Sequence, residues 1–338
     1  MSRQFMSIAM RLRSSAGFCF SQSTFGTIPN IAPPSKRKTP SLNIRTSKRP
    51  MRTRRQYGRR WISETFVTMT APARVHQGEP HREVDRAVSG IRPAQEQFGR
   101  VAEAYVDSPN HAQGADLDRV VELAIAHGGE RVVDVGTGVA HTLRRVAPAF
   151  RAAVGIDATR EMLEAGRGVL ERARVPGASL VQADATALPI ASGSIDVVTS
   201  RLASHHFADA AGAFREIARI LRPGGLFVLV DNFTPEGAEV DAFINDLERL
   251  RDASHVRSHT VRGWRHLAEA AGLRTSIDSE TSVTKLDVDS WLARSQTPKD
   301  RADAVRHRLR DASPAVVRAF DVTATSFSVH KLILLGRK

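Results

Sequence analysis

A glycine-rich segment near the middle of the chain has the residue types needed to bind a nucleoside. An apolar run, Arg131–Val135, precedes Gly136 and Gly138, and a second apolar run ends in Asp157. Glycine lets the backbone turn tightly and pass close to a ligand, because it has no side chain. An acid at the end of the next strand can accept hydrogen bonds from ribose hydroxyls. This spacing predicts a nucleoside-bearing cofactor at the carboxyl ends of parallel strands.

Three more residues bear on which cofactor this is. A dinucleotide fingerprint, G-x-G-x-x-G, requires a third glycine where this chain has His141. We expect the histidine to obstruct both helix–strand packing and the approach of a pyrophosphate. Asp134 lies two residues before the first glycine, where it could help hold a cationic methionyl group. Asp184 follows the third predicted strand, where it could meet an adenine amino group.

The elements that position these residues alternate along the chain. Short apolar runs predict strands at 131–135, 153–156, 179–182, 194–199, 226–230 and 325–335. Helical patterns lie at 116–127, 140–148, 160–174, 210–221 and 261–271. Another helix is expected from Gln95, because Phe98, Val101 and Tyr105 fall on one face. Strands separated by helices of this length predict an α/β fold with a doubly wound parallel sheet.

The charge of the chain is concentrated at its start. The 338 residues carry a formal net charge of +13, yet residues 1–68 hold 14 of the 49 Lys and Arg and one of the 36 acids. The other 35 bases and 35 acids cancel, so the basic face of a nucleic-acid-binding domain is not expected. We therefore expect no nucleic-acid partner. No apolar run is long enough for a membrane span, and the single Cys19 excludes a disulfide framework.

Residues 1–94 are predicted to be a disordered basic leader followed by a polar lead-in, because they lack a sustained hydrophobic period. Three interpretations of residues 1–68 stay open. The segment could be an organellar presequence or a tail that binds polyanions. It could also lie outside the native protein, with translation starting at Met69. We expect a cytoplasmic protein, with organellar import if the leader is a transit peptide.

The motifs together resemble those of class I S-adenosylmethionine (SAM)-dependent methyltransferases. The chain is similar to the small-molecule branch that includes the quinone-biosynthesis C-methyltransferases, from about Phe98 to Leu273. One departure is Ala140, where the family often has a third glycine, but alanine is small enough to let the cofactor bind. The matching segments, in the family's order and spacing, are 133–138, 155–157, 182–185, 195–198 and 221–225.

The resemblance implies a single Rossmann-like methyltransferase domain at residues 95–338. Its sheet would be mostly parallel and seven-stranded. Its core would lie at 130–235, with helical cap elements at 95–127 and 236–260. SAM would be the cofactor and a small molecule the methyl acceptor. The cofactor-binding residues that the resemblance implies are Asp134, Gly136, Thr137, Gly138, Asp157, Ala158, Asp184, Ala185 and Arg201.

Within that set the resemblance gives each group a place. Asp134 and the two glycines would contact the methionyl part, and Asp157 would bind the ribose. Asp184 and Ala185 would flank the adenine, and Arg201 would lie at the boundary between cofactor and substrate. For the two acids after the second and third strands, structural roles such as capping a helix stay open.

Methyl transfer depends mainly on holding donor and acceptor in line, and a base is needed only if the acceptor must lose a proton. His205 and His206 follow the fourth strand and are the candidate bases, with positioning or structural roles as alternatives. Four further residues are predicted to bind substrate: Tyr105, Arg251, His255 and Arg257. The two arginines could grip an anionic acceptor, or they could lie on a solvated helix face.

No metal site is expected. The chain has no H-E-x-x-H motif and no cysteine partners for its histidines, and adjacent histidines on a strand point to opposite faces. The sequence therefore predicts methyl transfer from SAM to a small molecule. A non-catalytic protein that binds SAM or S-adenosylhomocysteine (SAH) is one alternative. A nicotinamide-dependent oxidoreductase is another, disfavoured by His141. A homodimer is left open.

Overall fold

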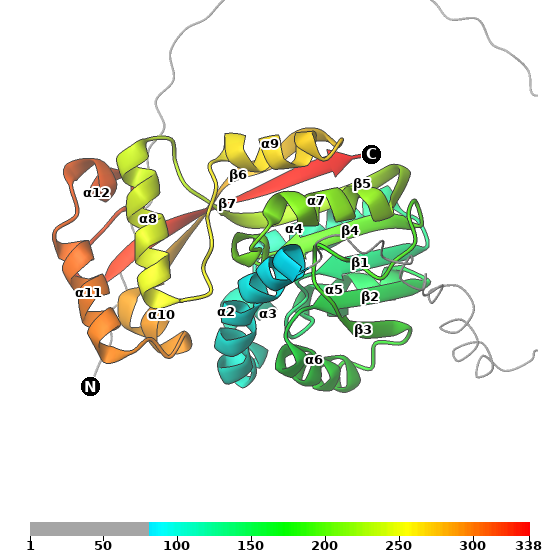
Figure 1. The fold of residues 1–338 in the computed structure, drawn as a ribbon, viewed down its shortest axis with the longest axis horizontal. Helices are drawn as coiled ribbons and strands as arrows, with labels where there is room; N and C mark the ends of the chain where they lie inside the picture. The colour runs from blue at the N-terminus through cyan, green and yellow to red at the C-terminus, as the bar shows by residue number, and fades with distance from the viewer. Residues whose placement is uncertain (1–80) are drawn as a thin grey trace, which may run out of the picture. The chain divides into compact units, whose positions relative to one another are not determined.

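The central element is an open seven-stranded sheet whose order is β3-β2-β1-β4-β5-β7-β6 (Figure 1). The computed structural model describes the backbone of residues 81–338 and the side chains of 92–109, 111–279 and 283–338. The predicted leader, residues 1–68, and residues 69–80 of the lead-in lie outside these residues. The strands are β1 Arg131–Val135, β2 Ala152–Asp157, β3 Ala178–Gln182, β4 Ile195–Arg201, β5 Leu221–Phe233, β6 Arg274–Asp287 and β7 Ser326–Arg337.

Strands β1 to β5 pair in parallel, whereas β7 runs antiparallel to both β5 and β6. This arrangement confirms the predicted α/β fold with a mostly parallel, seven-stranded sheet. None of the described helices is long and apolar enough to cross a membrane. The helices are α2 His81–Val106, α3 Pro109–Ala112, α4 Ala115–His127, α5 His141–Val146, α6 Arg160–Arg172, α7 Ala210–Ile220, α8 Ala238–Arg251, α9 Val261–Ala270, α10 Val288–Arg294, α11 Lys299–Arg310 and α12 Pro314–Phe320.

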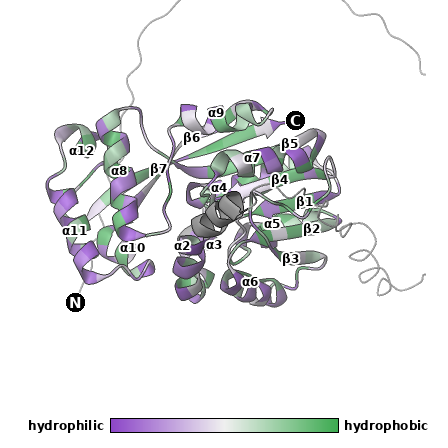
Figure 2. Cartoon of the chain, viewed as in Figure 1, coloured by the Kyte–Doolittle hydropathy of each residue, from purple (hydrophilic) through white to green (hydrophobic). Residues whose placement is uncertain are grey.

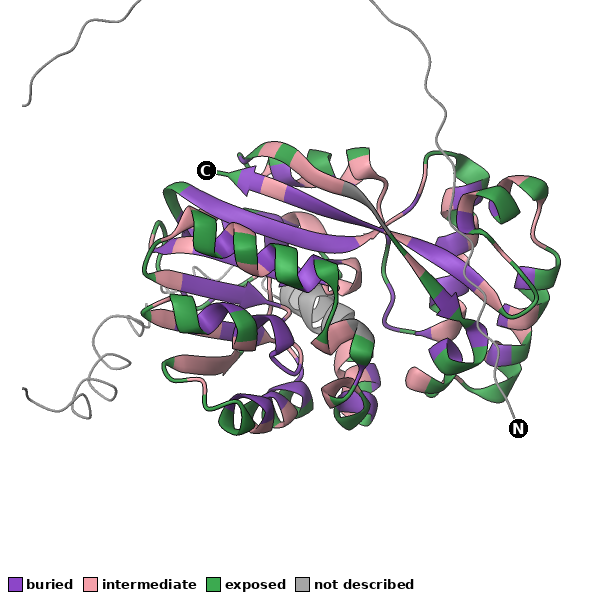
Figure 3. Cartoon of the chain, turned by 180° about the vertical axis from the view of Figure 1, so that it is seen from behind, coloured by how far each residue is buried: buried purple, intermediate pink, exposed green. Residues whose placement is uncertain are grey.

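Both faces of the sheet are buried, as Figure 3 shows for the central strands. Successive side chains of a strand point to opposite faces. In β1, Val133 and Val135 pack with α7 and α9, while the preceding Val132 packs with α4 and α5. Continuous apolar strands of this kind are typical of parallel sheets covered on both sides. The packing explains why the apolar runs in the sequence located these strands so closely.

A second hydrophobic core lies beyond the parallel strands. The outer halves of β6 and β7 contribute Leu286 and Phe327, which pack with Trp291 of α10 and Leu247 of α8. Helices α11 and α12 complete this cluster, with polar residues on their outer sides (Figure 2). We call this group of elements the cap core. It extends the predicted cap segment 236–260 to include elements from the C-terminal part of the chain.

The structure differs from the sequence prediction mainly in these outer elements. The helix expected from Gln95 is part of α2, which begins at His81. Strand β6 and helices α10 to α12 were not among the predicted ranges. Strand β6 lies at the sheet edge and carries many polar residues, so it lacks the continuous apolar run that marks the central strands.

Candidate functional site

The turn after β1 leaves bare backbone beside a cavity. Gly136 has φ of 70° and Gly138 has φ of 52°, both in the left-handed region that favours glycine. A Cβ on Gly136 would lie 2.4 Å from the Cβ of Ala203, so the turn packs directly on the segment after β4. A Cβ on Gly138 would meet nothing within 4 Å. The two glycines therefore serve different purposes, close packing at Gly136 and open backbone at Gly138.

Asp157 ties this turn to the end of β2. Its Oδ2 accepts a hydrogen bond from the Gly138 amide at 2.8 Å, and its Oδ1 accepts one from the Thr159 amide at 2.9 Å. Burial raises the pKa of this carboxyl, while the backbone amides oppose that rise. Each carboxylate oxygen can accept more than one hydrogen bond. Asp157 can therefore order the start of α6 and still accept a ligand hydroxyl.

Asp134 lies behind the cavity wall and is hydrogen-bonded to a residue that lines it. Its carboxylate accepts bonds from the hydroxyls of Thr137 at 2.7 Å and Thr199 at 2.6 Å. The side chain is buried, and burial raises its pKa to about 6 despite these two bonds. Thr137 lines the cavity, but Asp134 does not. The charge of Asp134 therefore reaches the cavity through Thr137 rather than by direct contact.

The next two residues on this side of the cavity hold the local backbone. Asp184 follows β3, and its Oδ1 accepts a bond from the Thr186 amide at 2.8 Å. His141 begins α5 and donates from Nε2 to the carbonyl oxygen of Tyr105 at 3.0 Å, which ties α2 to α5.

Ala140 holds the left-handed conformation at φ of 67°. The departure from glycine at this position is thus accommodated with a backbone conformation that glycine adopts more easily.

One cavity of about 660 Å³ connects these elements, a volume typical of small-molecule sites. Its lining includes the segments that follow β1, β2, β3 and β4, together with parts of α2, α8, α10, β6 and β7. The structure therefore brings most of the predicted site residues together. Those that line the cavity are Gly136, Thr137, Gly138, Asp157, Ala158, Asp184, Ala185, Arg201, His205, His206, Tyr105 and Arg251.

Arg201 joins the end of β4 to the N-terminal helices. Its Nε donates to Asp116 at 2.8 Å, and its Nη1 donates to the carbonyl oxygen of His111 at 3.0 Å. Lys331 of β7 lies 3.8 Å from the same Asp116 carboxylate. All three charged side chains are buried. Removing one partner of such a buried pair would leave an uncompensated charge, so Arg201 has a clear structural role as well as a place in the cavity wall.

His205 and His206 lie together on a short 3₁₀ turn, Ser204–His206, with ring centroids 4.1 Å apart. They follow β4, as expected from the sequence, and they do not lie on a strand. His205 donates from Nδ1 to Asp231 at 2.5 Å, and Asp231 is completely buried. Burial alone would lower the pKa of His205, but the Asp231 carboxylate holds that pKa above its ordinary value. Burial, followed by the nearby His205, lowers the pKa of His206 to about 4.

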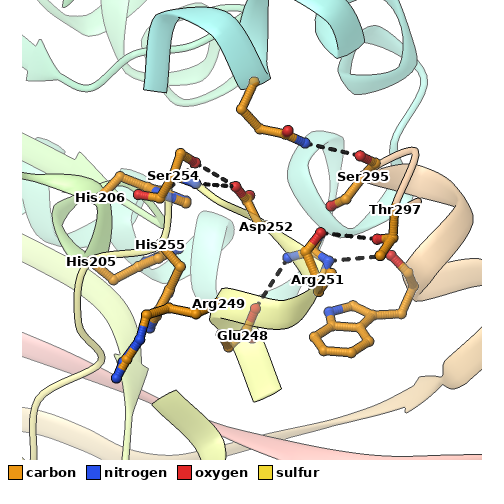
Figure 4. Close-up of polar contacts among 12 residues, drawn as sticks. His205, His206, Glu248, Arg249, Arg251, Asp252, Ser254, His255, Ser295 and Thr297 are labelled. Carbon is orange, nitrogen blue, oxygen red and sulfur yellow. Dashed lines mark hydrogen bonds and ion pairs between the residues drawn. The ribbon is translucent and has the colours of Figure 1, made fainter. Parts of the chain in front are cut away.

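The segment after α8 packs against these histidines (Figure 4). The amides of Val256 and Arg257 both donate to the carbonyl oxygen of His205 at 3.0 Å. His255 bonds to Asn245 at 3.0 Å, and burial is the main cause that takes its pKa well below the ordinary value. The Arg257 side chain pairs with Asp241 at 2.7 Å near the surface. Neither His255 nor Arg257 lines the cavity.

Arg251 and Tyr105 do face the cavity. The Arg251 guanidinium lies 3.2 Å from Glu248, as Figure 4 shows, and its Cζ is 4.9 Å from the ring centroid of Trp291. Burial raises the pKa of the Tyr105 phenol, while the positive charge of Arg251 opposes that rise. These contacts place a fixed guanidinium and a neutral phenol side by side on α8 and α2.

Sequence reasoning missed several polar or aromatic residues at or beside the cavity. One of them could have been found from the sequence. Asp231 directly follows the predicted strand 226–230, so it is expected at the same sheet edge as the predicted site. The others come from elements whose placement depends on the cap core. The missed residues are Asp231, Glu248, Trp291, Arg294 and Lys331. In the described part of the chain, no group of three or more His, Cys, Asp or Glu could hold a metal ion.

Comparison with known proteins places the described core among methyltransferases. Residues 133–229 match the methyltransferase domain family. YcgJ of Bacillus subtilis, named an uncharacterised methyltransferase, is 34% identical over 247 residues, covering 71% of this chain and 97% of YcgJ. Its crystal structure covers 66% of this chain and 97% of the YcgJ chain, with a TM-score of 0.64 and 33% identity.

Two other relatives have names that specify an activity. The 27-O-demethylrifamycin SV methyltransferase of Amycolatopsis mediterranei is 33% identical over 229 residues, covering 65% of this chain and 82% of that protein. The ubiquinone/menaquinone biosynthesis C-methyltransferase UbiE of Geotalea uraniireducens is 32% identical over 154 residues, covering 42% of this chain and 63% of UbiE.

The two glycines of the β1 turn offer a matched test of this geometry. Gly138→Ala should reduce the free energy of unfolding by about 1–2 kcal/mol, the cost of a left-handed alanine. Gly136→Ala should cost about 2–5 kcal/mol, because the collision with Ala203 adds to the same backbone strain. Urea denaturation measures both values. Equal costs would show that the turn does not pack on the segment after β4.

The two neighbouring histidines should titrate in opposite directions from the ordinary value of 6.5. An NMR titration of the imidazole rings should give a pKa above 6.5 for His205 and about 4 for His206. In Asp231→Asn the pKa of His205 should fall below 6.5, because burial then acts without the opposing carboxylate. A His205 pKa that does not change in this variant would contradict the ion pair.

Proposed function

This chain belongs to the methyltransferase family, and we propose that it transfers a methyl group from SAM to a small-molecule acceptor. The observation that carries the proposal is a single cavity with two chemically different walls. One wall holds the open backbone of Gly138 and the carboxylate of Asp157. The other holds His205, oriented by the buried Asp231. Cofactor-binding groups and a candidate base therefore face the same space.

The residues of the first wall fit SAM. The bare Gly138 backbone leaves room for the cofactor chain, since a Cβ there would meet no other atom. Asp157 has acceptor capacity for ribose hydroxyls, and Asp184 and Ala185 line the same cavity after β3. The Asp134 charge behind Thr137 favours a cationic group. When bound, SAM supplies a methyl group on a positively charged sulfur.

The His205–Asp231 pair has the geometry of a general base. Because Nδ1 donates to Asp231, the other ring nitrogen, Nε2, is left to accept a proton from the acceptor. A base works best when its pKa lies near the working pH, which the raised pKa of His205 favours. His206, with a pKa of about 4, is neutral at neutral pH and a weaker base. We assign the base role to His205 and a positioning role to His206.

A small acceptor suits the size and enclosure of the cavity. Its second half is formed by apolar and polar side chains of α8, α10, β6 and β7 rather than by an open groove. The relatives named for a rifamycin and for quinone biosynthesis support the same class of acceptor. Holding such a molecule in line with the methyl donor is the main catalytic contribution that we assign to these elements.

Cofactor binding should depend on pH through Asp134. Calorimetric titration should show binding of SAM and SAH and none of NAD. Because a cationic ligand favours the charged carboxylate, the affinity for SAM should fall as the pH drops through about 6. In Asp134→Asn the affinity should be weaker and lose this pH dependence. A folded protein that binds NAD but not SAM would overturn the proposed function.

Turnover should depend on His205 separately from binding. With a panel of phenolic, carboxylic and thiol acceptors, release of SAH from SAM should be reduced by about 10²–10⁴-fold in His205→Gln where the acceptor must lose a proton. The affinity for SAH should stay close to that of the wild type. His206→Gln is the matched control and should affect turnover less. Wild-type binding of SAM without turnover on any acceptor would favour the non-catalytic alternative.

A further inference from the structure

Four basic side chains are among the residues that line the cavity. They come from β4, α8, α10 and β7. We call them the cationic wall: Arg201, Arg251, Arg294 and Lys331. Their charges are not matched one for one by carboxylates, and this imbalance indicates what the cavity binds.

Three members of the cationic wall have ionic partners. Arg201 and Lys331 share the buried Asp116, at 2.8 Å and 3.8 Å. Arg251 pairs with Glu248 at 3.2 Å. Asp252 also lies near Arg251, but the bonds to its Oδ1 come from the amide and hydroxyl of Ser254. A fourth carboxylate, Asp231, also acts on Lys331, but it is bonded to His205. Counting Asp116, Glu248 and Asp252 against the four bases leaves one positive charge in excess.

The base without an ionic partner is Arg294. Within the described residues it forms no ion pair, and its buried Nε has no hydrogen-bond partner. The negative charge of Glu248 stabilises the charged form of Arg294, but the Glu248 carboxylate is bonded to Arg251. Burial, and then repulsion by Arg251, lower the pKa of the Arg294 guanidinium. The Arg294 side chain is half-buried, and a partly desolvated charge of this kind is stabilised when an anion pairs with it.

No group on the elements around Arg294 compensates its positive charge. On α10 itself, Asp289 is exposed and pairs with Arg306 at 2.8 Å. On α2, burial keeps the phenol of Tyr105 neutral by raising its pKa. The carbonyl end of α10 offers only a partial negative charge. None of these groups forms an ion pair with Arg294, so a bound anionic ligand would supply the partner that it lacks.

The surroundings also limit the rest of that ligand. Leu286, Trp291 and Val329 line the same part of the cavity. The ring of Trp291 is already in contact with Arg251 and Phe327. Together these side chains suit an apolar body with a single anionic group.

We propose that Arg294 binds a carboxylate of the methyl acceptor, which makes the substrate an apolar carboxylic acid. This inference rests on the proposed function, because it assigns the acceptor side of that site. The planar guanidinium matches a carboxylate through two parallel hydrogen bonds. Sequence reasoning expected Arg251 and Arg257 to grip an anion, and the geometry gives this role to Arg294 beside Arg251. The methionyl carboxylate of the cofactor shares the same chemistry, and the experiment separates the two sources.

Matched ligand pairs test the proposal. With the protein saturated with SAH, calorimetry measures the binding of benzoic, 2-naphthoic and octanoic acids and of their primary amides at neutral pH. We expect at least one acid to bind about tenfold or more tightly than its amide. Arg294→Gln should abolish this preference, and Arg294→Lys should retain part of it. Arg318→Gln, at an exposed position on α12, is the matched control and should leave the preference intact.

Three results would overturn the assignment. One is that no acid binds better than its amide, including the case in which neither binds. Another is a preference that survives in Arg294→Gln. The third is loss of SAH affinity in Arg294→Gln, which would assign this arginine to the cofactor's own carboxylate. Failure of the wild type to bind SAH at all would instead count against the proposed function.

Stability gives a readout that is independent of any acid. Because Arg294→Gln removes a half-buried charge that has no ion pair and is repelled by Arg251, the ligand-free variant should melt no lower than the wild type. A purely structural arginine would behave in the opposite way, and its loss would lower the melting temperature. A marked drop in Arg294→Gln would therefore contradict the proposal.

Discussion

The site depends on the close packing of the β1 turn against the segment after β4. Gly136 has no space for a side chain because Ala203 lies against it. This contact fixes the turn that offers the open backbone of Gly138 relative to the turn that carries His205. Both turns lie at the carboxyl ends of adjacent parallel strands, where ligands bind in open α/β sheets. The two walls of the cavity are thus positioned by one contact between backbone and a methyl group.

Buried charges organise the rest of the cavity, and nearly all of them are compensated. Asp157 is held by two backbone amides and Asp134 by two threonine hydroxyls. Asp231 raises the pKa of His205, and the same burial that isolates this pair lowers the pKa of His206. Two neighbouring histidines therefore have pKa values that are shifted in opposite directions by their surroundings. Such separation of pKa values is typical of sites that transfer protons.

The cap core places the acceptor side of the cavity. Strands β6 and β7 extend beyond the parallel strands and pack with four helices around Trp291 and Phe327. This second core carries Arg251 and Arg294 to the cavity without help from the cofactor-binding turns. In the proposed function, the ends of the parallel strands would hold the donor and the cap core would determine which acceptor fits.

The sequence by itself determined the parallel core and the donor side. Buried strands such as β1 and β5 are continuous apolar runs, and Gly136, Gly138 and Asp157 lie at short, fixed distances from them. These signals are local, because burial on both faces and tight turns leave their mark within a few residues.

Only the tertiary structure decided the acceptor side. It directed Arg257 and His255 away from the cavity and Arg294 and Lys331 into it. It also paired His205 with Asp231 across 26 positions of the chain. Such choices depend on packing between elements that are distant in the sequence, and no local pattern of residues encodes them.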